Sequence, residues 1–294
     1  MSQITANNLQ IEYEAFGPAE APAILLIMGL GAQLSRWNIE LCEALVDRGY
    51  RVIRFDNRDC GLSSKLDEAG VPNIGEALRS GVPIVAPYTL ADMAADSVAL
   101  LDVLAIERAH IVGASMGGAI AQIIAALYPQ RSLSLTCIMS TSSNPELPPP
   151  TREASHALLA PLPTTRDKES LVEDALRRQL AVASPDFPSC PERLRQVLVE
   201  EHERGFHPRG VARQLAAFLG SGDRRALLRT INVPTLVLHG ADDPLIPVAC
   251  GRDVAAHIPG AQMRVIAGMA HDLPVALTEV FANAIAGIAQ SRAR

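Results

Sequence analysis

Short apolar runs alternate with segments of helical periodicity over most of the chain, and this alternation limits the fold more than any other feature. The run at 23–28 is apolar at every position, which indicates a strand buried on both faces. A second expected strand, at 109–112, is followed by a largely apolar helical pattern at 117–128. Buried strands that alternate with helices predict an α/β fold, with a mostly parallel central sheet of about eight strands and helices on both faces.

Residues 141–225 interrupt this alternation. The segment opens with a proline-rich stretch and contains several helical patterns, but no run that is typical of a strand. We therefore expect a helical cap at 141–225, inserted into a core that consists of residues 1–140 and 226–294. A second long connection, at 66–90, contains the short helical pattern IGEALRS.

Composition and charge exclude several classes of function. The 294 residues include 26 basic and 32 acidic side chains, and the net charge of −6 argues against a nucleic-acid-binding protein or a polybasic membrane anchor. No apolar run reaches the length of about 18 residues that a membrane span requires. The N-terminal sequence does not resemble a secretion signal, and the 5 cysteines are widely spaced, so we expect reduced thiols in a cytoplasmic protein. The sequence also lacks metal-ligand spacing and nucleotide-binding motifs, so we expect no metal and no cofactor.

The sharpest local signal is Gly113-Ala114-Ser115-Met116-Gly117, a GxSxG pattern between an expected strand and an expected helix. Such a turn raises the serine hydroxyl above the sheet, and its glycines allow the strand and helix to approach closely. The N-terminus of the following helix favours negative charge that develops nearby. Ser115 is therefore the candidate nucleophile, and Gly113 and Gly117 are the candidate elbow glycines. The plain alternative is a turn of small residues that serves only close packing.

A nucleophilic serine requires a base and an orienting acid. Asp242 and Asp243 follow the expected strand at 234–238, at the edge where such sheets bind ligands. We take Asp243 as the candidate acid, because Asp242 suits a turn or a helix cap better. His271 follows the last expected strand and is the candidate base, whereas His257, the other histidine beyond Asp243, ends an expected helix.

A glycine-rich turn, Met28 to Ala32, follows the first buried strand. Backbone N–H groups in such a turn can stabilise an oxyanion, and we take those of Leu30 and Met116 as the candidate donors. The charged stretch 56–59 follows the next strand, where we favour ion pairs that fix the loops over a catalytic role.

The expected cap is rich in apolar side chains, which predicts an apolar substrate pocket. The candidate lining residues are Leu158, Leu159, Leu162, Leu171, Leu180, Leu215 and Phe218. Of the histidines in the cap, His207 is the one we expect to line the pocket.

Taken together, these motifs resemble those of the α/β-hydrolase fold superfamily over nearly the whole chain. The corresponding segments are MGLGAQ at the oxyanion turn, RFDNRDCGLSS after the next strand, GASMGG at the elbow, LHGADDPLIP in the acid loop and GMAHDLP in the histidine loop. The chain most resembles the esterase group that includes aclacinomycin methylesterase, and more distantly the cofactor-free haloperoxidases and the proline iminopeptidases. The resemblance implies the roles given above for Ser115, Asp243, His271, Leu30 and Met116.

The chain departs from that pattern at a few positions. Many relatives carry His-Gly where this chain has Met28-Gly29, and many have Gly where Cys60 stands. Because the oxyanion role rests on backbone N–H groups, we expect it to survive the first change.

The sequence thus predicts a serine carboxylic-ester hydrolase that forms an acyl-enzyme with small to medium, largely apolar esters. Three alternatives stay open at this point. A proline iminopeptidase would need inward-facing cap carboxylates, for which Glu146, Glu153 and Glu173 are available. A haloperoxidase or perhydrolase would use the same residues, and a ligand receptor would use the pocket without catalysis. The expected partner is a small-molecule ester, and a homodimer through the cap or an edge strand is compatible with the sequence.

Overall fold

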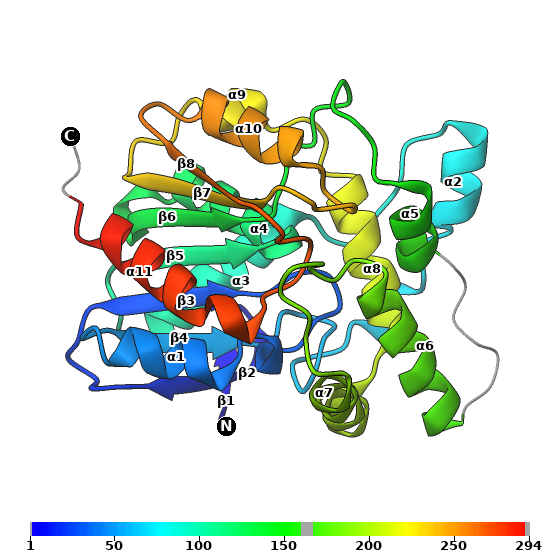
Figure 1. The fold of residues 1–294 in the computed structure, drawn as a ribbon, viewed down its shortest axis with the longest axis horizontal. Coiled ribbons are helices and arrows are strands. Elements are labelled where there is room, and N and C mark those ends of the chain that lie inside the picture. The colour runs from blue at the N-terminus through cyan, green and yellow to red at the C-terminus, as the bar shows by residue number, and fades with distance from the viewer. Residues whose placement is uncertain (1, 160–166, 292–294) are drawn as a thin grey trace.

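The computed structural model describes residues 2–159 and 167–291, which include one eight-stranded sheet (Figure 1). The strand order is β1-β2-β4-β3-β5-β6-β7-β8. The strands are β1 (Ser2–Ala6), β2 (Leu9–Phe16), β3 (Ala23–Ile27), β4 (Arg51–Phe55), β5 (Ala109–Ala114), β6 (Ser132–Ile138), β7 (Thr235–Gly240) and β8 (Gln262–Ile266). The helices are α1 (Ile39–Val46), α2 (Ile74–Ser80), α3 (Leu90–Val103), α4 (Met116–Leu127), α5 (Arg152–Leu159), α6 (Lys168–Leu180), α7 (Pro191–Gly205), α8 (Pro208–Leu219), α9 (Arg225–Leu228), α10 (Val248–His257) and α11 (Thr278–Ala289).

The pairing of the strands confirms the expected mostly parallel α/β sheet. All pairs from β4 to β8 are parallel, whereas β1 and β2 join the edge as an antiparallel hairpin. The sequence analysis missed β1. A signal was present in Asn7-Asn8, because both residues adopt positive φ (50° and 61°), as the central residues of tight two-residue hairpin turns do.

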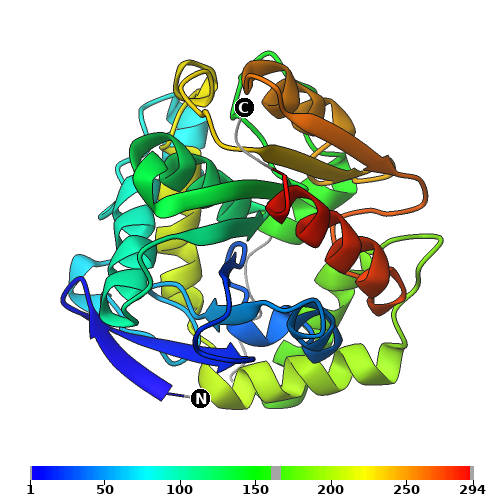
Figure 2. The same cartoon turned by 90° about the vertical axis from the view of Figure 1, so that its left-hand side faces the viewer.

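Helices cover both faces of the sheet and bury it in two hydrophobic layers. Helices α1 and α11 lie side by side on one face, and α3 and α4 lie on the other (Figures 1 and 2). Strands β3 and β5 are buried at every position, which is why their sequences consist of apolar or small residues, except for His110 in β5. Because helices pack on both faces of the sheet, the strand ends are held in place, and with them the loops that carry the candidate site residues.

Helices α5 to α8 lie between β6 and β7 in the chain, and Figure 1 shows them at one end of the sheet, with α5 next to α2. Two side chains of α8 reach core loops: Arg213 pairs with Asp59, and Gln214 accepts a hydrogen bond from the N–H of Gly31. The cap at 141–225 and the core at 1–140 and 226–294 stay a prediction, with which this arrangement agrees.

The charged stretch after β4 forms buried ion pairs, as favoured from the sequence. Asp56 binds Arg204 of α7 at 2.5 Å, and Asp59 binds Arg213 at 2.6 Å. Arg58 pairs with Asp96 of α3 at 2.6 Å. Because all of these carboxylates are buried, their partners are needed to offset the cost of removing the charges from water.

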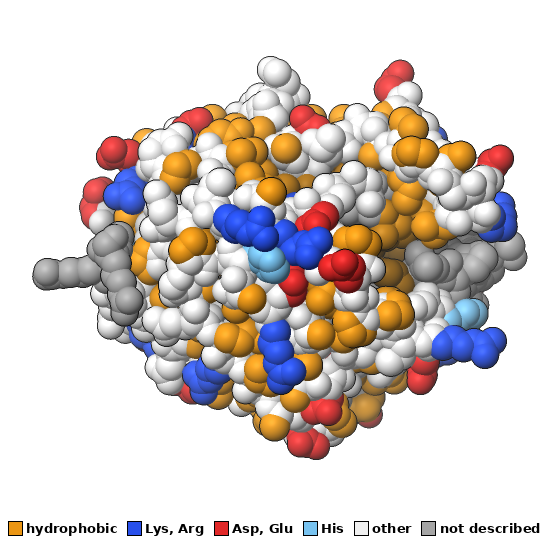
Figure 3. All heavy atoms as spheres, turned by 90° about the horizontal axis from the view of Figure 1, so that it is seen from above, with side chains coloured by type: hydrophobic (Ala, Val, Ile, Leu, Met, Phe, Trp, Pro, Cys, Tyr) orange, Lys and Arg blue, Asp and Glu red, His pale blue; other side chains and the backbone are white. Residues whose placement is uncertain are grey.

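The surface is mixed in charge. On the face drawn in Figure 3, basic side chains lie next to acidic ones and are interspersed with hydrophobic atoms. None of the described helices combines the length and apolar character needed to cross a bilayer.

Strand β5 contains a buried histidine that should make stability depend on pH. His110 is 6% exposed and its Nδ1 lies 2.9 Å from Ser134 Oγ. Burial lowers the pKa of His110 to about 4. The folded state therefore binds this proton less tightly than the unfolded state, where the pKa is about 6.5, so stability is complete above that pH and falls as the pH decreases towards 4.

We expect the free energy of unfolding of the wild type to fall by about 2 kcal/mol more between pH 7 and pH 5 than that of His110→Gln. Urea unfolding at the two pH values measures this difference. Because other titrating groups are common to both proteins, the comparison isolates His110. Equal losses in the two proteins would contradict the prediction.

Candidate functional site

Ser115 occupies the sharp turn between β5 and α4. Its backbone has φ 56° and ψ −122°, a conformation that is strained for a residue with a side chain. The turn is held on both sides: the N–H of Ser115 donates to Ile138 O (2.9 Å), and its carbonyl accepts from Gly118 N (2.9 Å). The hydroxyl is thereby presented at the carboxyl end of β5.

The two predicted elbow glycines permit this turn. A Cβ on Gly113 would lie 2.1 Å from Gly117 O, and a Cβ on Gly117 would lie 2.1 Å from Ile27 O. Both contacts involve backbone atoms, so neither can be relieved by a side-chain rotation. The GxSxG spacing therefore has a steric cause in this fold.

The structure brings Ser115, His271 and Asp243 together in one chain of hydrogen bonds. His271 Nε2 lies 3.0 Å from Ser115 Oγ, and His271 Nδ1 lies 2.7 Å from Asp243 Oδ2. Because an ionised carboxylate only accepts hydrogen bonds, Nδ1 carries the proton and Nε2 is free to accept from the hydroxyl. This arrangement allows a histidine to remove a proton from a serine as the serine attacks.

The two neighbouring aspartates have different surroundings. Asp243 is buried, and its Oδ1 accepts hydrogen bonds from the backbone N–H groups of Leu245 (2.9 Å) and Ile246 (2.8 Å). Its other oxygen is thus aimed at His271. Asp242 is exposed and accepts a hydrogen bond from Gly268 N (2.8 Å), so it joins its own loop to the loop after β8.

The loop that carries His271 is braced by the segment between α6 and α7. The N–H of His271 donates to Val182 O (2.9 Å). Ser184 Oγ accepts from Ala270 N (2.8 Å) and donates to the Asp272 carboxylate. Burial raises the pKa of Asp272. Val182 and Ser184 are not predicted from the sequence, because no local pattern links the segment after α6 to a loop so far along the chain.

The candidate oxyanion donors lie on either side of Ser115. Gly29, at the start of the turn after β3, faces the serine so closely that a Cβ there would lie 3.0 Å from Ser115 Cβ. Within residues 2–159 and 167–291, neither the N–H of Leu30 nor that of Met116 donates to a protein acceptor. Both groups are therefore available to a ligand oxygen.

Ser115 and His271 lie in the wall of a cavity of about 1610 Å³. Leu30 and Met116 also line it, together with the expected pocket residues Leu158, Leu171, His207, Leu215 and Phe218. Leu180 does not line the cavity and is 49% exposed, so its expected pocket role is wrong: it lies on the outer face of α6. Leu162 and the side chain of Leu159 lie outside the described residues.

His207 is held in a polar cluster at the edge of this cavity. Its Nε2 lies 3.0 Å from Asp67 Oδ1 and 3.1 Å from Arg213 Nη2. The imidazole thus has a structural anchor as well as a place in the cavity wall.

None of the cap carboxylates invoked for an iminopeptidase lines the cavity. Glu146 pairs with Arg225, Glu173 pairs with Arg195, and Glu153 is exposed. The three carboxylates named for that alternative therefore do not face the cavity, whereas three other acidic residues of the segment 141–225, Asp174, Glu200 and Glu201, do line it. Of these, Asp174 pairs with Arg178 and Glu201 pairs with Arg36.

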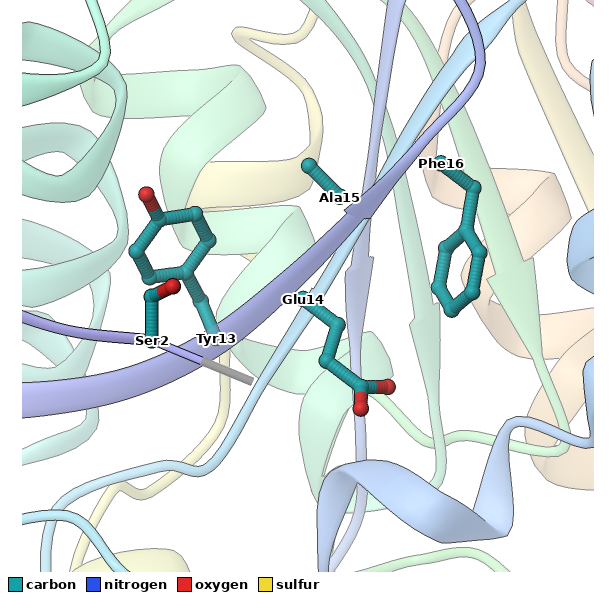
Figure 4. A pocket seen from close by; sticks show the side chains of 5 residues that line it. All are labelled: Ser2, Tyr13, Glu14, Ala15 and Phe16. Carbon is teal, nitrogen blue, oxygen red and sulfur yellow. The ribbon is translucent and has the colours of Figure 1, made fainter.

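A second depression, of about 280 Å³, lies on the amino-terminal hairpin (Figure 4). Its lining consists of Ser2, Tyr13, Glu14, Ala15 and Phe16, and Glu14 is bound to Arg54 at 2.8 Å. It contains no pairing of nucleophile and base. Among the described residues, no group of three or more His, Cys, Asp or Glu side chains is arranged to hold a metal ion.

Comparison with known proteins places this chain in a family. Residues 22–275 match the family model described as the alpha/beta hydrolase fold. The chain is 30% identical to rhodomycin D methylesterase of Streptomyces peucetius, over 96% of this chain and 95% of that protein. It is 28% identical to 3-oxoadipate enol-lactonase 2 of Acinetobacter baylyi, over 90% of this chain and 87% of that protein.

A solved structure shows the same fold. The enol-lactonase of Burkholderia xenovorans LB400 superposes with a TM-score of 0.75 at 22% identity, covering 99% of this chain and 100% of that chain. With the family match over most of the sequence, this chain belongs to the α/β-hydrolase fold family.

Proposed function

We propose that the protein is a serine carboxylic-ester hydrolase that works through Ser115, His271 and Asp243. The observation that carries the proposal is the hydrogen-bond chain from Asp243 through His271 to Ser115 in the wall of a large apolar cavity. The names of the matched methylesterase and enol-lactonase support an ester as the bond that is cleaved.

The proposed reaction has two halves. Ser115 Oγ attacks the ester carbonyl while its proton passes to His271 Nε2, and collapse of the tetrahedral adduct expels the alcohol, which takes that proton. Water then attacks the acyl-enzyme, gives a proton to His271, and the acid leaves as the proton returns to Ser115 Oγ. The protonated imidazole that forms in each half is stabilised by Asp243, which also holds the ring in place.

The negative charge on the carbonyl oxygen would be held by the backbone N–H groups of Leu30 and Met116. Their lack of a protein acceptor within the described ranges supports this role. The N-terminus of α4, which begins at Met116, adds a favourable field for the same charge. Loss of one such donor typically costs about 3 kcal/mol of transition-state stabilisation.

The cavity supports a substrate with a bulky apolar group, larger than the small to medium esters expected from the sequence. Its volume, about 1610 Å³, exceeds the roughly 300 to 1,000 Å³ of ordinary ligand sites. We infer that residues 141–225 act as the cap over this space, because α8 supplies Val211, Leu215 and Phe218 to its wall.

The acyl preference tests both the reaction and the size of the cavity. We expect hydrolysis of p-nitrophenyl esters from acetate to decanoate, with kcat/KM rising as the acyl chain lengthens, since each buried CH₂ contributes about 0.8 kcal/mol. Initial rates under conditions below the micelle threshold give these values. A fluorophosphonate probe should label one site per chain, and peptide mapping should locate the adduct on Ser115.

Two outcomes would contradict this proposal. The absence of turnover on every ester by folded protein would overturn ester hydrolysis, and amides of N-terminal proline and peroxide-dependent reactions would then be tested. A sharp fall in kcat/KM beyond butyrate would instead overturn the bulky acyl group while leaving the reaction intact.

A further inference from the structure

The peptide that carries the Leu30 N–H lies between two peptides that are held by side chains. On one side, Asn57 Nδ2 donates to Met28 O (2.9 Å). On the other, the N–H of Gly31 donates to Gln214 Oε1 (2.8 Å). Among the described residues, the Gly29–Leu30 peptide itself is held by one longer hydrogen bond, from Ala32 N to Gly29 O (3.3 Å). The direction of the Leu30 N–H therefore depends on its two neighbours.

Gln214 is held in place at both ends of its side-chain amide group. Its side chain is fully buried, and its Nε2 donates to Arg58 O (2.7 Å) in the loop after β4. Because both ends of the amide are bonded, the oxygen cannot exchange with the nitrogen without losing both contacts. The side chain thus links the turn after β3 to the loop after β4.

Gln214 belongs to α8, the helix whose other face lines the cavity. Val211, Leu215 and Phe218 of α8 lie in the cavity wall, whereas Gln214 does not. Next to it, Arg213 anchors the helix to buried Asp59 through two hydrogen bonds (2.8 and 2.6 Å). The position of α8 on the core and the orientation of the oxyanion turn are therefore coupled through the adjacent residues Arg213 and Gln214.

We propose that Gln214 is a positioning residue for the reaction. It aligns the Leu30 N–H with the developing oxyanion, and it makes that alignment depend on the position of α8 on the core. This inference rests on the proposed function. Gln214 touches neither the substrate cavity nor the reacting atoms, and it acts through the backbone of Gly31.

The test compares Gln214→Met, which keeps the length of the side chain and removes both hydrogen bonds, with the wild type. We expect kcat to fall about 10- to 100-fold, since small misplacements of catalytic groups cost up to this much. KM should stay within about threefold, because the loss is confined to the transition state. An arylboronic acid, whose adduct with Ser115 Oγ places an oxygen at the oxyanion position, should lose affinity by the same factor as kcat/KM.

Two further variants separate positioning from packing. Gln214→Glu keeps an oxygen that can accept from Gly31 N, so it should recover at least part of kcat relative to Gln214→Met. It also provides the test if the methionine variant does not fold. Gln122→Met is the packing control. Gln122 is another fully buried glutamine; it lies on α4 and its Nε2 donates to Thr141 O. This variant should lower Tm and leave kcat within about twofold of the wild type.

The possible outcomes distinguish a failure of this inference from a failure of the proposed function. Wild-type turnover with unchanged kcat and boronate affinity in Gln214→Met would overturn the inference and leave the proposed function standing. A fall in kcat that Gln122→Met reproduces, or one that Gln214→Glu does not reverse at all, would also overturn it. An inactive wild type would overturn the proposed function and this inference with it.

Discussion

Ser115→Ala will lower kcat for ester hydrolysis by about 10⁶-fold, because the variant lacks the atom that forms the acyl-enzyme. The backbone at this position is already strained, and alanine adopts the same φ of 56° no more easily than serine does. We therefore expect Tm to change little. Initial rates on the best ester of the acyl series, with fluorophosphonate titration to exclude traces of host esterases, measure the effect.

A second serine provides the matched control. Ser97 is also buried, and its hydroxyl donates to Met93 O (3.0 Å) within α3, away from the cavity. Ser97→Ala should keep kcat within about twofold of the wild type. If Ser115→Ala retained more than about one hundredth of the wild-type rate after correction, another nucleophile would be needed.

Arg213→Met should give the largest loss of stability, about 3 to 5 kcal/mol in the free energy of unfolding. The side chains of Arg213 and Asp59 are both fully buried and joined by two hydrogen bonds. Without the guanidinium, the Asp59 charge keeps only the Tyr88 hydroxyl and the Leu66 N–H as partners. Guanidinium chloride unfolding, followed by circular dichroism and tryptophan fluorescence, measures the change.

A double variant and a surface pair test the cause. Asp59→Leu combined with Arg213→Met removes both charges, and it should recover most of the lost stability. Arg195→Met breaks the exposed pairs with Glu169 and Glu173, so it should change the free energy of unfolding by no more than about 0.5 kcal/mol. A loss below about 1 kcal/mol in Arg213→Met would contradict the argument that the buried charge needs its partner.

The loops of the candidate site were predictable because the residues concerned follow parallel strands. Ser115 comes directly after β5, and Asp243 and His271 lie in the loops that follow β7 and β8. The carboxyl ends of parallel strands meet at one edge of the sheet. The central strands were also plain in the sequence, because burial on both faces makes them mostly apolar, and β3 is apolar at every position. The edge strand β1 lacks that signal, since most of its residues are exposed.

The contacts between the expected cap and the core could not be predicted in the same way. Gln214 and Gly31 are 183 positions apart, and Ser184 and Ala270 are 86 positions apart. Helical periodicity indicates which face of α8 is buried, but it does not indicate which loop that face meets. Leu180, in the expected cap, illustrates the same limit: its apolar side chain predicts a place in the pocket, but it lies exposed at the end of α6.

The contacts of Ser184 and Gln214 with the core have a consequence for chimeric enzymes. Any residue at position 182 with the same backbone path would supply the carbonyl that accepts the hydrogen bond from the His271 N–H. The hydroxyl of Ser184 and the amide of Gln214, in contrast, come only from those side chains. Transplanting residues 141–225 from another member of the family would thus exchange the walls of the cavity and the supports of the reacting groups in one step. One segment of sequence therefore determines both the substrate specificity and the alignment of the reacting groups. An active chimera has to keep both Ser184 and Gln214.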